Sequence, residues 1–251
     1  MIHFVGAGPG AVDLITVRGA ELLKKTDSII YAGSLVNPQL LDYAKPGTDI
    51  YNSAKMTLEE VIDVMKKNEA AGKDTVRLHT GDASLYGAIR EQMDLLDEAG
   101  IAYEDVPGVS SFSGAAAALN AEYTLPSVSQ SVVITRMAGR TPVPEKEGVA
   151  AFAQHGSTMV IFLSTGLLEN VQKELLSGAY TEDTPAAIVY KATWPDEKVV
   201  RCTVGTLAES AKKENIAKTA LILVGGFLGS SYDRSKLYDP SFTTEFRKAS
   251  K

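Results

Sequence analysis

The sequence predicts an α/β protein with two α/β domains and mixed, largely parallel sheets. Short apolar runs rich in β-branched residues alternate with longer segments of helical periodicity through most of the chain, a pattern typical of parallel sheets covered by helices. The polar stretch EYTLPSVSQ, residues 122–130, interrupts this alternation. A length of 251 residues is sufficient for two domains of ordinary size. We therefore expect one domain over residues 1–121, a second over 130–230 and a polar tail over 231–251.

The first half of the chain shows the alternation clearly. The expected order is strand 2–8, helix 16–26, strand 28–33, helix 57–72, strand 75–81, helix 87–100, strand 101–108, and a loop leading into a small-residue helix over 107–121. Thr57 and Glu60 have the spacing of a capping box, and Gly72 supplies the matching stop. Both signals agree with the helical periodicity of the segment between them.

The second half has a higher share of strand. Strands are expected over 131–136, 158–164, 186–192, 199–207 and 219–226, and helices around 149–154, 167–176 and 207–214. The residues after Gly229 are mostly polar, so we expect a loose tail there.

Charge and hydropathy disfavour several functional classes. The chain has 25 basic and 31 acidic side chains, and its net charge of −6 disfavours nonspecific binding to nucleic acid or to anionic membranes. The longest apolar runs, such as 220–224, are much shorter than the roughly 18 residues that span a bilayer as a helix. A strand-like segment starts directly after Met1, so we expect no secretion signal and a cytoplasmic protein.

The cysteine and histidine residues do not suggest a disulfide framework or a metal site. Cys202 is the single cysteine, which excludes an intrachain disulfide and a cysteine metal cluster within one subunit. His3, His79 and His155 lie far apart and lack the short spacing of histidine metal ligands. We therefore expect Cys202 in the core and no metal site.

The stretch GAGPGA, residues 6–11, matches the GxGxxG/A pattern of dinucleotide-binding loops. The plausible helix caps, Asp13 and Thr16, come several residues later, so the helix N-terminus would not face a pyrophosphate. The strand 28–33 ends without the acidic residue that binds ribose, and Pro9 has no N–H to offer. A structural turn, a ligand loop of another kind and a dinucleotide loop remain as alternatives for this glycine turn.

Two further loops follow expected parallel strands. GDASLYG, residues 81–87, contains Asp82 and Tyr86, and PGVSSFSG, residues 107–114, offers small side chains and hydroxyl groups. Ligands of open α/β sheets bind at the carboxyl ends of the strands. These two loops and the glycine turn are therefore candidate ligand loops on one edge, with a helix N-cap as the alternative role of Asp82.

Arg136 and Arg140 lie in ITRMAGRTPVPEKE, residues 134–147, where several residues favour turns. Loop arginines are usually solvated, and the alternative is bidentate binding of substrate carboxylates. The GxSxG elbow of Ser/His/Asp hydrolases and the P-loop lysine pattern are absent from the sequence. His79 is accordingly interpreted as a strand residue.

Four motifs, in this order, resemble one known family. They are VGAGPGAVDLITVRGAELL, LHTGDASLYG, VPGVSSFSGAAAAL and TALILVGG, and together they are similar to the tetrapyrrole (corrin and porphyrin) methyltransferases that use S-adenosylmethionine. The resemblance covers about residues 1–230 and implies a tetrapyrrole substrate, a ligand cleft between the two domains and a homodimer. The segments 31–41 and 134–147 are most similar to members that methylate ring carbon 11 of precorrin-4 or cobalt-precorrin-4 in cobalamin synthesis.

The resemblance also implies which residues contact S-adenosylmethionine or its product, S-adenosylhomocysteine. By matching position these are Pro9, Gly81, Asp82, Ala83, Tyr86, Ser111 and Phe112 in the first domain, and Leu163, Ala187, Thr219 and Ala220 in the second. Family members often have a proline where this chain has Ala83, a departure that concerns the rigidity of the loop. Arg18, Arg136 and Arg140 are hypothesised to bind the carboxylates of the macrocycle, and no catalytic base is assigned.

Three rival functions remain open at this point. A nicotinamide-dependent dehydrogenase is suggested by the glycine pattern alone. A noncatalytic module that binds a tetrapyrrole or a nucleotide is suggested by the lack of an obvious catalytic acid or base. A methyltransferase that acts on a different ring carbon is the third, and the sequence does not determine whether the substrate contains cobalt.

Overall fold

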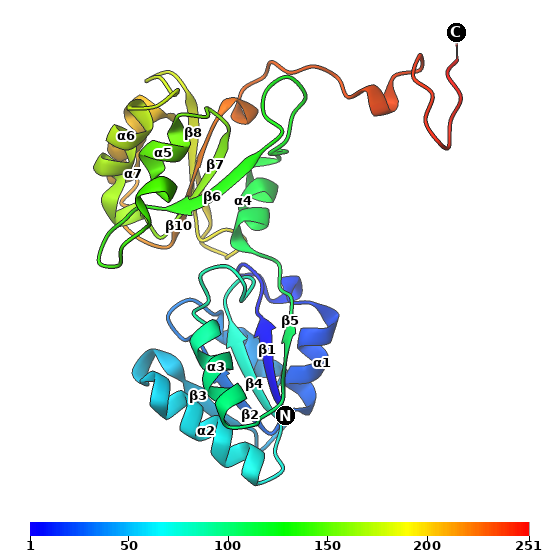
Figure 1. Cartoon of the computed structure of the whole chain (residues 1–251), viewed down its shortest axis with the longest axis vertical. Helices are drawn as coiled ribbons and strands as arrows, with labels where there is room; N and C mark the ends of the chain where they lie inside the picture. The colour runs from blue at the N-terminus through cyan, green and yellow to red at the C-terminus, as the bar shows by residue number, and fades with distance from the viewer. Residues whose placement is uncertain (251) are drawn as a thin grey trace. The chain divides into compact units, whose positions relative to one another are not determined.

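The computed structural model describes residues 1–250, which form two compact units (Figure 1). Unit 1 comprises Met1–Ala115 together with Lys191–Glu197, and unit 2 comprises Ala116–Tyr190 and residues 198–250. The boundary falls inside helix α4, Ser111–Leu119, and a short segment from the second half of the chain belongs to the first unit.

Unit 1 is built on a sheet of five parallel strands in the order β3-β2-β4-β1-β5. Gly6 of β1 pairs with His79 of β4, and Val5 pairs with Val106 of β5, so these three strands end at one edge. The edge strand β3 was not expected, because it is short, partly polar and pairs with β2 alone. The five strands are β1 (Ile2–Gly6), β2 (Ser28–Tyr31), β3 (Asp49–Asn52), β4 (Thr75–His79) and β5 (Tyr103–Val106).

Helix α1 lies on one face of this sheet, and α2 and α3 lie on the other (Figure 1). Alternate residues of β1 point to opposite faces, so Val5 packs with Leu23 of α1 and Phe4 packs with Met65 of α2. The helices are α1 (Val17–Lys25), α2 (Leu58–Ala70) and α3 (Arg90–Glu98).

Two of the predicted helix starts are confirmed. The Thr16 side chain accepts a hydrogen bond from the Gly19 N–H at 3.1 Å, and α1 starts at the next residue. Thr57 and Glu60 form the predicted capping box: Glu60 accepts from the Thr57 N–H at 2.8 Å, and the Glu60 N–H donates to the Thr57 hydroxyl at 3.3 Å.

Helix α3 starts later than expected. It begins at Arg90 and not near Gly87, because Tyr86 and Ala88 have left-handed φ angles of 57° and 50°. A right-handed helix cannot include such residues. The segment between β4 and α3 is therefore an irregular loop.

The sheet of unit 2 has the order β6-β7-β10-β8-β9 and is mixed. Only β6 and β7 pair in parallel, whereas β10 pairs antiparallel with β7 and β8, and β8 pairs antiparallel with β9. The expectation of largely parallel pairing is correct for the first sheet and wrong for this one, because β8 and β9 are joined by a short loop and not by a crossover helix. The strands are β6 (Val132–Arg136), β7 (Thr158–Phe162), β8 (Pro185–Tyr190), β9 (Lys198–Thr203) and β10 (Ala220–Val224).

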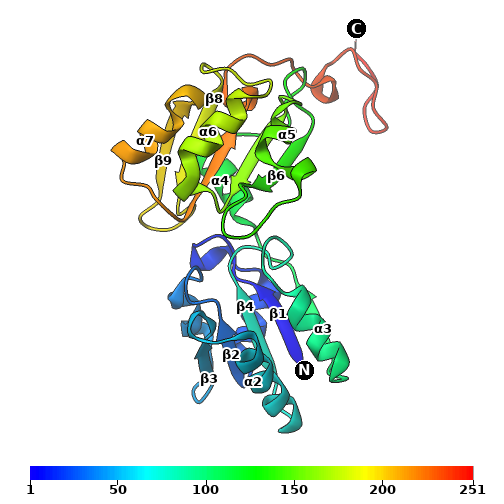
Figure 2. The same ribbon diagram turned by 60° about the vertical axis from the view of Figure 1, so that its left-hand side comes forward.

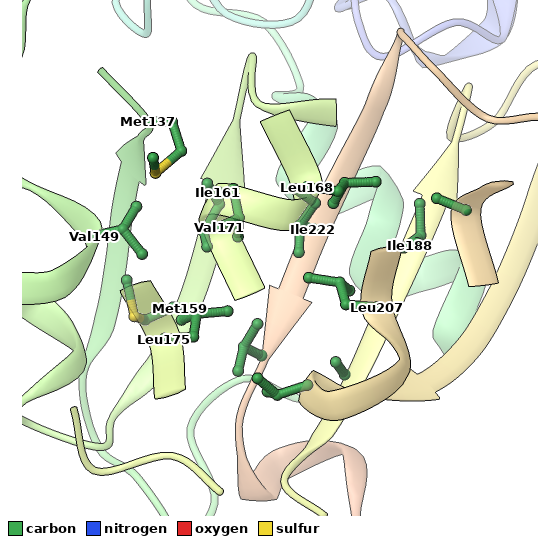
Figure 3. Packing of buried hydrophobic residues seen from close by; sticks show 14 of the residues in the cluster. Met137, Val149, Met159, Ile161, Leu168, Val171, Leu175, Ile188, Leu207 and Ile222 are labelled. Atoms are coloured by element: carbon green, nitrogen blue, oxygen red, sulfur yellow. The ribbon is translucent and has the colours of Figure 1, made fainter. Parts of the chain in front are cut away.

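Helices α5, α6 and α7 cover one face of this sheet (Figure 2). Their apolar side chains, among them Val171 and Leu207, meet Ile161 and Ile222 of the central strands in one core (Figure 3). Cys202 of β9 is half-buried against this core, and burial raises the pKa of its thiol to about 11. The helices are α5 (Val149–Ala153), α6 (Leu168–Leu176) and α7 (Leu207–Lys213), and the expected strands and helices of this half are all present.

The chain after Gly229 contains no strand in its described residues. Its one regular element is a 3-10 turn over Lys236–Tyr238, and large side chains such as Tyr238 and Phe246 are exposed there. Within residues 1–250, no helix has the length and apolar character needed to cross a membrane.

Candidate functional site

Three loops of unit 1 meet at the carboxyl ends of β1, β4 and β5. Gly8 and Gly81 exchange two backbone hydrogen bonds of 3.2 and 2.8 Å, which join the first loop to the second. A Cβ atom added to Gly6 would lie 2.5 Å from the Gly108 Cα, and one added to Gly108 would lie 2.1 Å from the Gly81 carbonyl oxygen. Such contacts are possible only between residues without side chains. The glycines therefore let the three backbones form one continuous surface at the sheet edge.

Asp82 joins the second loop to the third. Its Oδ2 accepts the Gly108 N–H at 2.8 Å, and its Oδ1 accepts the Ser84 N–H at 3.0 Å and the Ser84 hydroxyl. Burial opposes ionisation of this carboxyl, but these hydrogen bonds outweigh that effect and lower its pKa. The alternative role as a helix N-cap is wrong, because α3 begins only at Arg90.

Side chains from two other segments fix the backbone of the glycine turn. The Trp194 indole N–H donates to the Pro9 carbonyl at 3.1 Å, and the Asn37 amide donates to the Gly10 carbonyl at 2.8 Å. The Ala11 N–H donates to the hydroxyl oxygen of Thr193 at 2.9 Å. With that N–H engaged and the helix starting only after Thr16, the turn lacks the geometry of a dinucleotide loop.

Sequence reasoning missed the residues that fix this turn. Trp194 and Pro9 are separated by 185 residues, and Asn37 lies 27 residues from Gly10, so no local pattern links them. The available signals were weak: a single tryptophan before Pro195, and an asparagine before a proline.

The cofactor contacts expected in the first half lie on or next to these three loops. Tyr86 is 45% exposed and has a left-handed φ angle of 57°, whereas Ala83 is buried. Ser111 is the first residue of α4, directly after the third loop. Unit 1 thus brings together at one sheet edge the expected residues Pro9, Gly81, Asp82, Ala83, Tyr86, Ser111 and Phe112.

Three of the four contacts expected in unit 2 also share a sheet edge. Leu163 follows β7 and Thr219 precedes Ala220, the first residue of β10, and the antiparallel register places these chain ends together. Leu163 is 65% exposed at a φ angle of 52°, and Thr219 has a φ angle of 56°. Left-handed backbone at such side chains costs about 1–3 kcal/mol and is concentrated at functional sites. Ala187 differs, because it is fully buried inside β8 opposite Leu223.

The three arginines have different environments. Arg136, the last residue of β6, donates to the carbonyl oxygens of Met137, Thr141 and Pro142 at 3.2, 3.2 and 2.7 Å, so it orders the loop that follows. Arg140 is exposed within that loop, and Arg18 is exposed in the first turn of α1. A cation in the first turn of a helix is unfavourable for local stability, so the position of Arg18 has no helix-stabilising explanation.

Two titratable side chains are buried on β4. Arg77 donates to the Gln92 side-chain oxygen at 3.0 Å and to the Ile30 carbonyl at 3.2 Å, and burial lowers its pKa to about 10. The His79 Nε2 has no hydrogen-bond partner among the described residues. Burial, followed by the charge of Arg77, lowers the pKa of His79 to about 3. His79 is therefore a neutral strand residue, as expected.

Comparison with known proteins agrees with this geometry. Residues 1–208 match the model of the tetrapyrrole (corrin/porphyrin) methylases. The cobalt-precorrin-4 C(11)-methyltransferase of Methanocaldococcus jannaschii is 56% identical over 251 residues, which cover 100% of this chain and 97% of that protein.

Two solved structures are similar over most of the chain. The X-ray structure of a cobalamin biosynthetic enzyme, cobalt precorrin-4 methyltransferase, has a TM-score of 0.89 at 48% identity and covers 91% of this chain and 96% of its own. The uroporphyrin-III C-methyltransferase of Thermus thermophilus in complex with S-adenosylhomocysteine has a TM-score of 0.74 at 25% identity, with 90% and 92% covered. From its sequence motifs, its fold and these matches, the chain belongs to the tetrapyrrole (corrin/porphyrin) methylases.

Proposed function

We propose that this protein transfers a methyl group from S-adenosylmethionine to carbon 11 of cobalt-precorrin-4 in cobalamin biosynthesis. The observation that carries the proposal is the 56% identity, over the whole chain, to the cobalt-precorrin-4 C(11)-methyltransferase of Methanocaldococcus jannaschii. Metal-free precorrin-4 is the alternative substrate. The homodimer and the cytoplasmic location stay predictions, and light scattering of the purified protein tests the first of them.

The loop edge of unit 1 fits S-adenosylmethionine in two respects. The missing side chains at Gly6, Gly81 and Gly108 let the three loops pack backbone against backbone, so a ligand at this edge would meet main-chain groups. The carboxylate of Asp82 is held ionised at this edge and supplies negative charge for a donor that contains sulfonium and ammonium groups. The residues proposed to hold the donor are those expected from the sequence, Pro9, Gly81, Asp82, Ala83, Tyr86, Ser111, Phe112, Leu163, Ala187, Thr219 and Ala220.

When bound, the donor supplies a methyl group made electrophilic by positively charged sulfur. The protein's main task is then orientation, because holding two reactants in near-attack geometry contributes about 7–11 kcal/mol to lowering a barrier. The loops joined by glycine contacts and by Asp82 provide such a rigid surface. We assign no catalytic base, and His79 is unsuited to that role because it is buried on β4.

The function is tested by incubating the purified protein with S-adenosylmethionine and either cobalt-precorrin-4 or metal-free precorrin-4. Mass spectrometry is expected to detect the gain of one methyl group, faster with the cobalt complex, and a ¹³C-labelled methyl group locates the modified carbon by NMR. The absence of methyl gain with both substrates would contradict the enzyme assignment, and a label at another carbon would contradict the position.

Asp82→Ala is expected to weaken S-adenosylhomocysteine binding about tenfold in isothermal titration calorimetry. The substitution leaves the partly buried Gly108 N–H without its carboxylate acceptor and removes negative charge from the loop edge; a buried donor left unpaired costs about 1–3 kcal/mol, and a partly buried one costs less. Asp94→Ala on α3 is the matched control, since Asp94 pairs with exposed Arg90 away from the loop edge. If the Asp82→Ala variant binds S-adenosylhomocysteine with unchanged affinity, Asp82 stabilises the loop but does not contribute to binding.

Replacing Arg18 and Arg140 with alanine is expected to raise KM for the tetrapyrrole several-fold, with little change in melting temperature, because both side chains are exposed. Arg136→Ala is expected to lower the melting temperature as well, since its guanidinium holds three loop carbonyls. Steady-state kinetics at two salt concentrations measures the charge effect, with Arg234→Ala in the tail as control. If a variant with alanine in place of Arg18, Arg136 and Arg140 keeps the KM of the wild type, these arginines do not bind the substrate.

A further inference from the structure

The segment Lys191–Glu197, here called the strap, lies between β8 and β9 in sequence but belongs to unit 1. It contacts the glycine turn through two polar bonds, from the Trp194 indole to the Pro9 carbonyl at 3.1 Å and from the Ala11 N–H to Thr193 at 2.9 Å. The strap therefore forms hydrogen bonds with one backbone carbonyl and one backbone N–H of the glycine turn.

Two glycines make room for the strap. A Cβ atom on Gly10 would lie 2.1 Å from the Trp194 Cδ1 and 2.3 Å from its Nε1, so the indole ring fills the space that a side chain would need. A Cβ atom on Gly114 of α4 would lie 3.1 Å from both the Thr193 Cγ2 and the Pro9 Cβ. The glycine turn, the strap and the start of α4 are thus packed as one assembly, and Gly10 is explained by Trp194 and not by a phosphate.

The strap is braced by its own side chains. Lys191 and Thr193 have left-handed φ angles of 46° and 70°, a conformation that persists only when the surroundings impose it. The Thr193 N–H donates to Glu197 at 2.5 Å, Lys191 pairs with Asp196 at 2.6 Å, and the Lys191 Nζ lies 5.2 Å from the centroid of the Trp194 ring. This bracing presents the indole N–H to the turn in one orientation.

We propose that the strap sets the conformation of the glycine turn for donor binding and methyl transfer, with Trp194 as its positioning residue. The inference rests on the proposed function, because it assumes that Pro9 contacts S-adenosylmethionine. With the strap in place, the carbonyl of Pro9 and the N–H of Ala11 face the strap, so the backbone is held on both sides of Gly10. Without it, the segment between Gly8 and Val12 keeps the Asn37 bond at Gly10 and the bond from the Leu14 N–H to the Ala11 carbonyl at 3.2 Å.

Trp194 also provides the readout, because it is the single tryptophan of the sequence. Its fluorescence therefore reports the environment of the glycine turn without interference from another indole. Titration of the wild-type protein with S-adenosylhomocysteine is expected to change the emission, with the same Kd as calorimetry gives. Binding that leaves the emission unchanged would contradict the coupling between strap and site.

The decisive experiment compares Trp194→Ala and Trp194→Phe. The alanine variant is expected to raise the Kd for S-adenosylhomocysteine and to lower kcat at saturating substrates, each about tenfold, because small misplacements at a reacting centre are costly. The phenylalanine variant keeps the ring contact with Gly10 but not the N–H donor, so it is expected to recover part of the loss. Phe246→Ala, which removes an exposed aromatic side chain of the tail, is the control.

A double-mutant cycle separates positioning from general damage. Gly10→Ala alone is expected to weaken S-adenosylhomocysteine binding about as much as Trp194→Ala, because the new methyl group displaces the indole. In the Trp194→Ala background the same change is expected to cost much less, since the clash is gone. Additive losses would contradict the proposal. If Trp194→Ala does not fold, Trp194→Phe and Thr193→Val, which removes the acceptor for Ala11, decide the question.

The possible failures are distinguishable. If wild-type protein does not bind S-adenosylhomocysteine in calorimetry, the proposed function is wrong, and the inference that rests on it is wrong with it. If wild-type protein binds and the strap variants bind and react equally well, the inference alone is overturned. A lower melting temperature with unchanged Kd and kcat would likewise assign the strap a purely structural role.

Discussion

Gly108→Ala is expected to lower the free energy of unfolding by about 3 kcal/mol and to abolish measurable S-adenosylhomocysteine binding. The new Cβ atom would lie 2.1 Å from the Gly81 carbonyl oxygen and 2.7 Å from the Gly6 Cα, both backbone atoms that no rotamer change can move. Overpacking of this kind typically costs 1–3 kcal/mol, occasionally more. Because the two partners lie on the other two loops, relief of the clash must separate the loops that form the candidate site.

Urea denaturation followed by circular dichroism measures the loss of stability, and calorimetry measures binding below the denaturation midpoint. Gly166→Ala is the matched control, since its nearest non-neighbouring atom to the added Cβ is 3.8 Å away. That variant is expected to stay close to wild type in both measurements. A Gly108→Ala protein with wild-type stability would mean that the three loops are not in tight backbone contact.

His79→Leu is expected to make the stability of the protein less sensitive to acid. Between pH 6.5 and pH 4.5, the free energy of unfolding of the variant should fall by about 2–3 kcal/mol less than that of the wild type. Burial, and then the charge of Arg77, lowers the pKa of His79 to about 3 in the folded protein, against an ordinary value of 6.5. Between these two values the unfolded chain binds a proton that the folded protein does not, so stability falls as the pH falls. The expected slope is about 1.4 kcal/mol per pH unit.

The measurement is urea denaturation of wild type and variant at several pH values, because other groups contribute equally to both proteins. As the pH is lowered, the free energy of unfolding of the wild type should fall faster than that of the variant. Any advantage in stability that the wild type has at neutral pH should therefore shrink or reverse. His155→Leu removes an exposed imidazole and serves as control. Parallel pH profiles of wild type and His79→Leu would show that His79 is protonated, or reaches solvent, in the folded state.

Much of the fold could be predicted from the sequence because the signals are local. Capping residues such as Thr16 and Thr57 mark helix starts within one turn. Short runs rich in apolar and β-branched residues mark strands such as β4 and β10. The edge strand β3 was missed because DIYN is short, exposed at its start and stabilised by pairing with β2 alone.

Part of the candidate site could be predicted because the motifs of its loops are also local in the sequence. Glycine-rich motifs and Asp82 identify the loops, and the rule that parallel strands end at one edge places the loops together. Arg136 illustrates the limit: its position in a turn-rich segment left solvation and binding of substrate carboxylates as alternatives, and no pattern in the sequence indicated that its guanidinium donates to three backbone carbonyls. Which partner a polar side chain finds depends on the folded chain and not on its neighbours in sequence.

The sequence by itself determined the α/β class, the position of nearly every helix and strand, and the family, because periodicity and motifs are properties of short segments. The tertiary structure decided the direction of the strands in the second sheet, the pairing of Asp82 with Gly108 across 26 residues, and the contact of Trp194 with Pro9 across 185. Each of these features depends on hydrogen bonds between segments that lie far apart in the sequence. Such contacts are selected by the packing of the whole core, which no local pattern encodes.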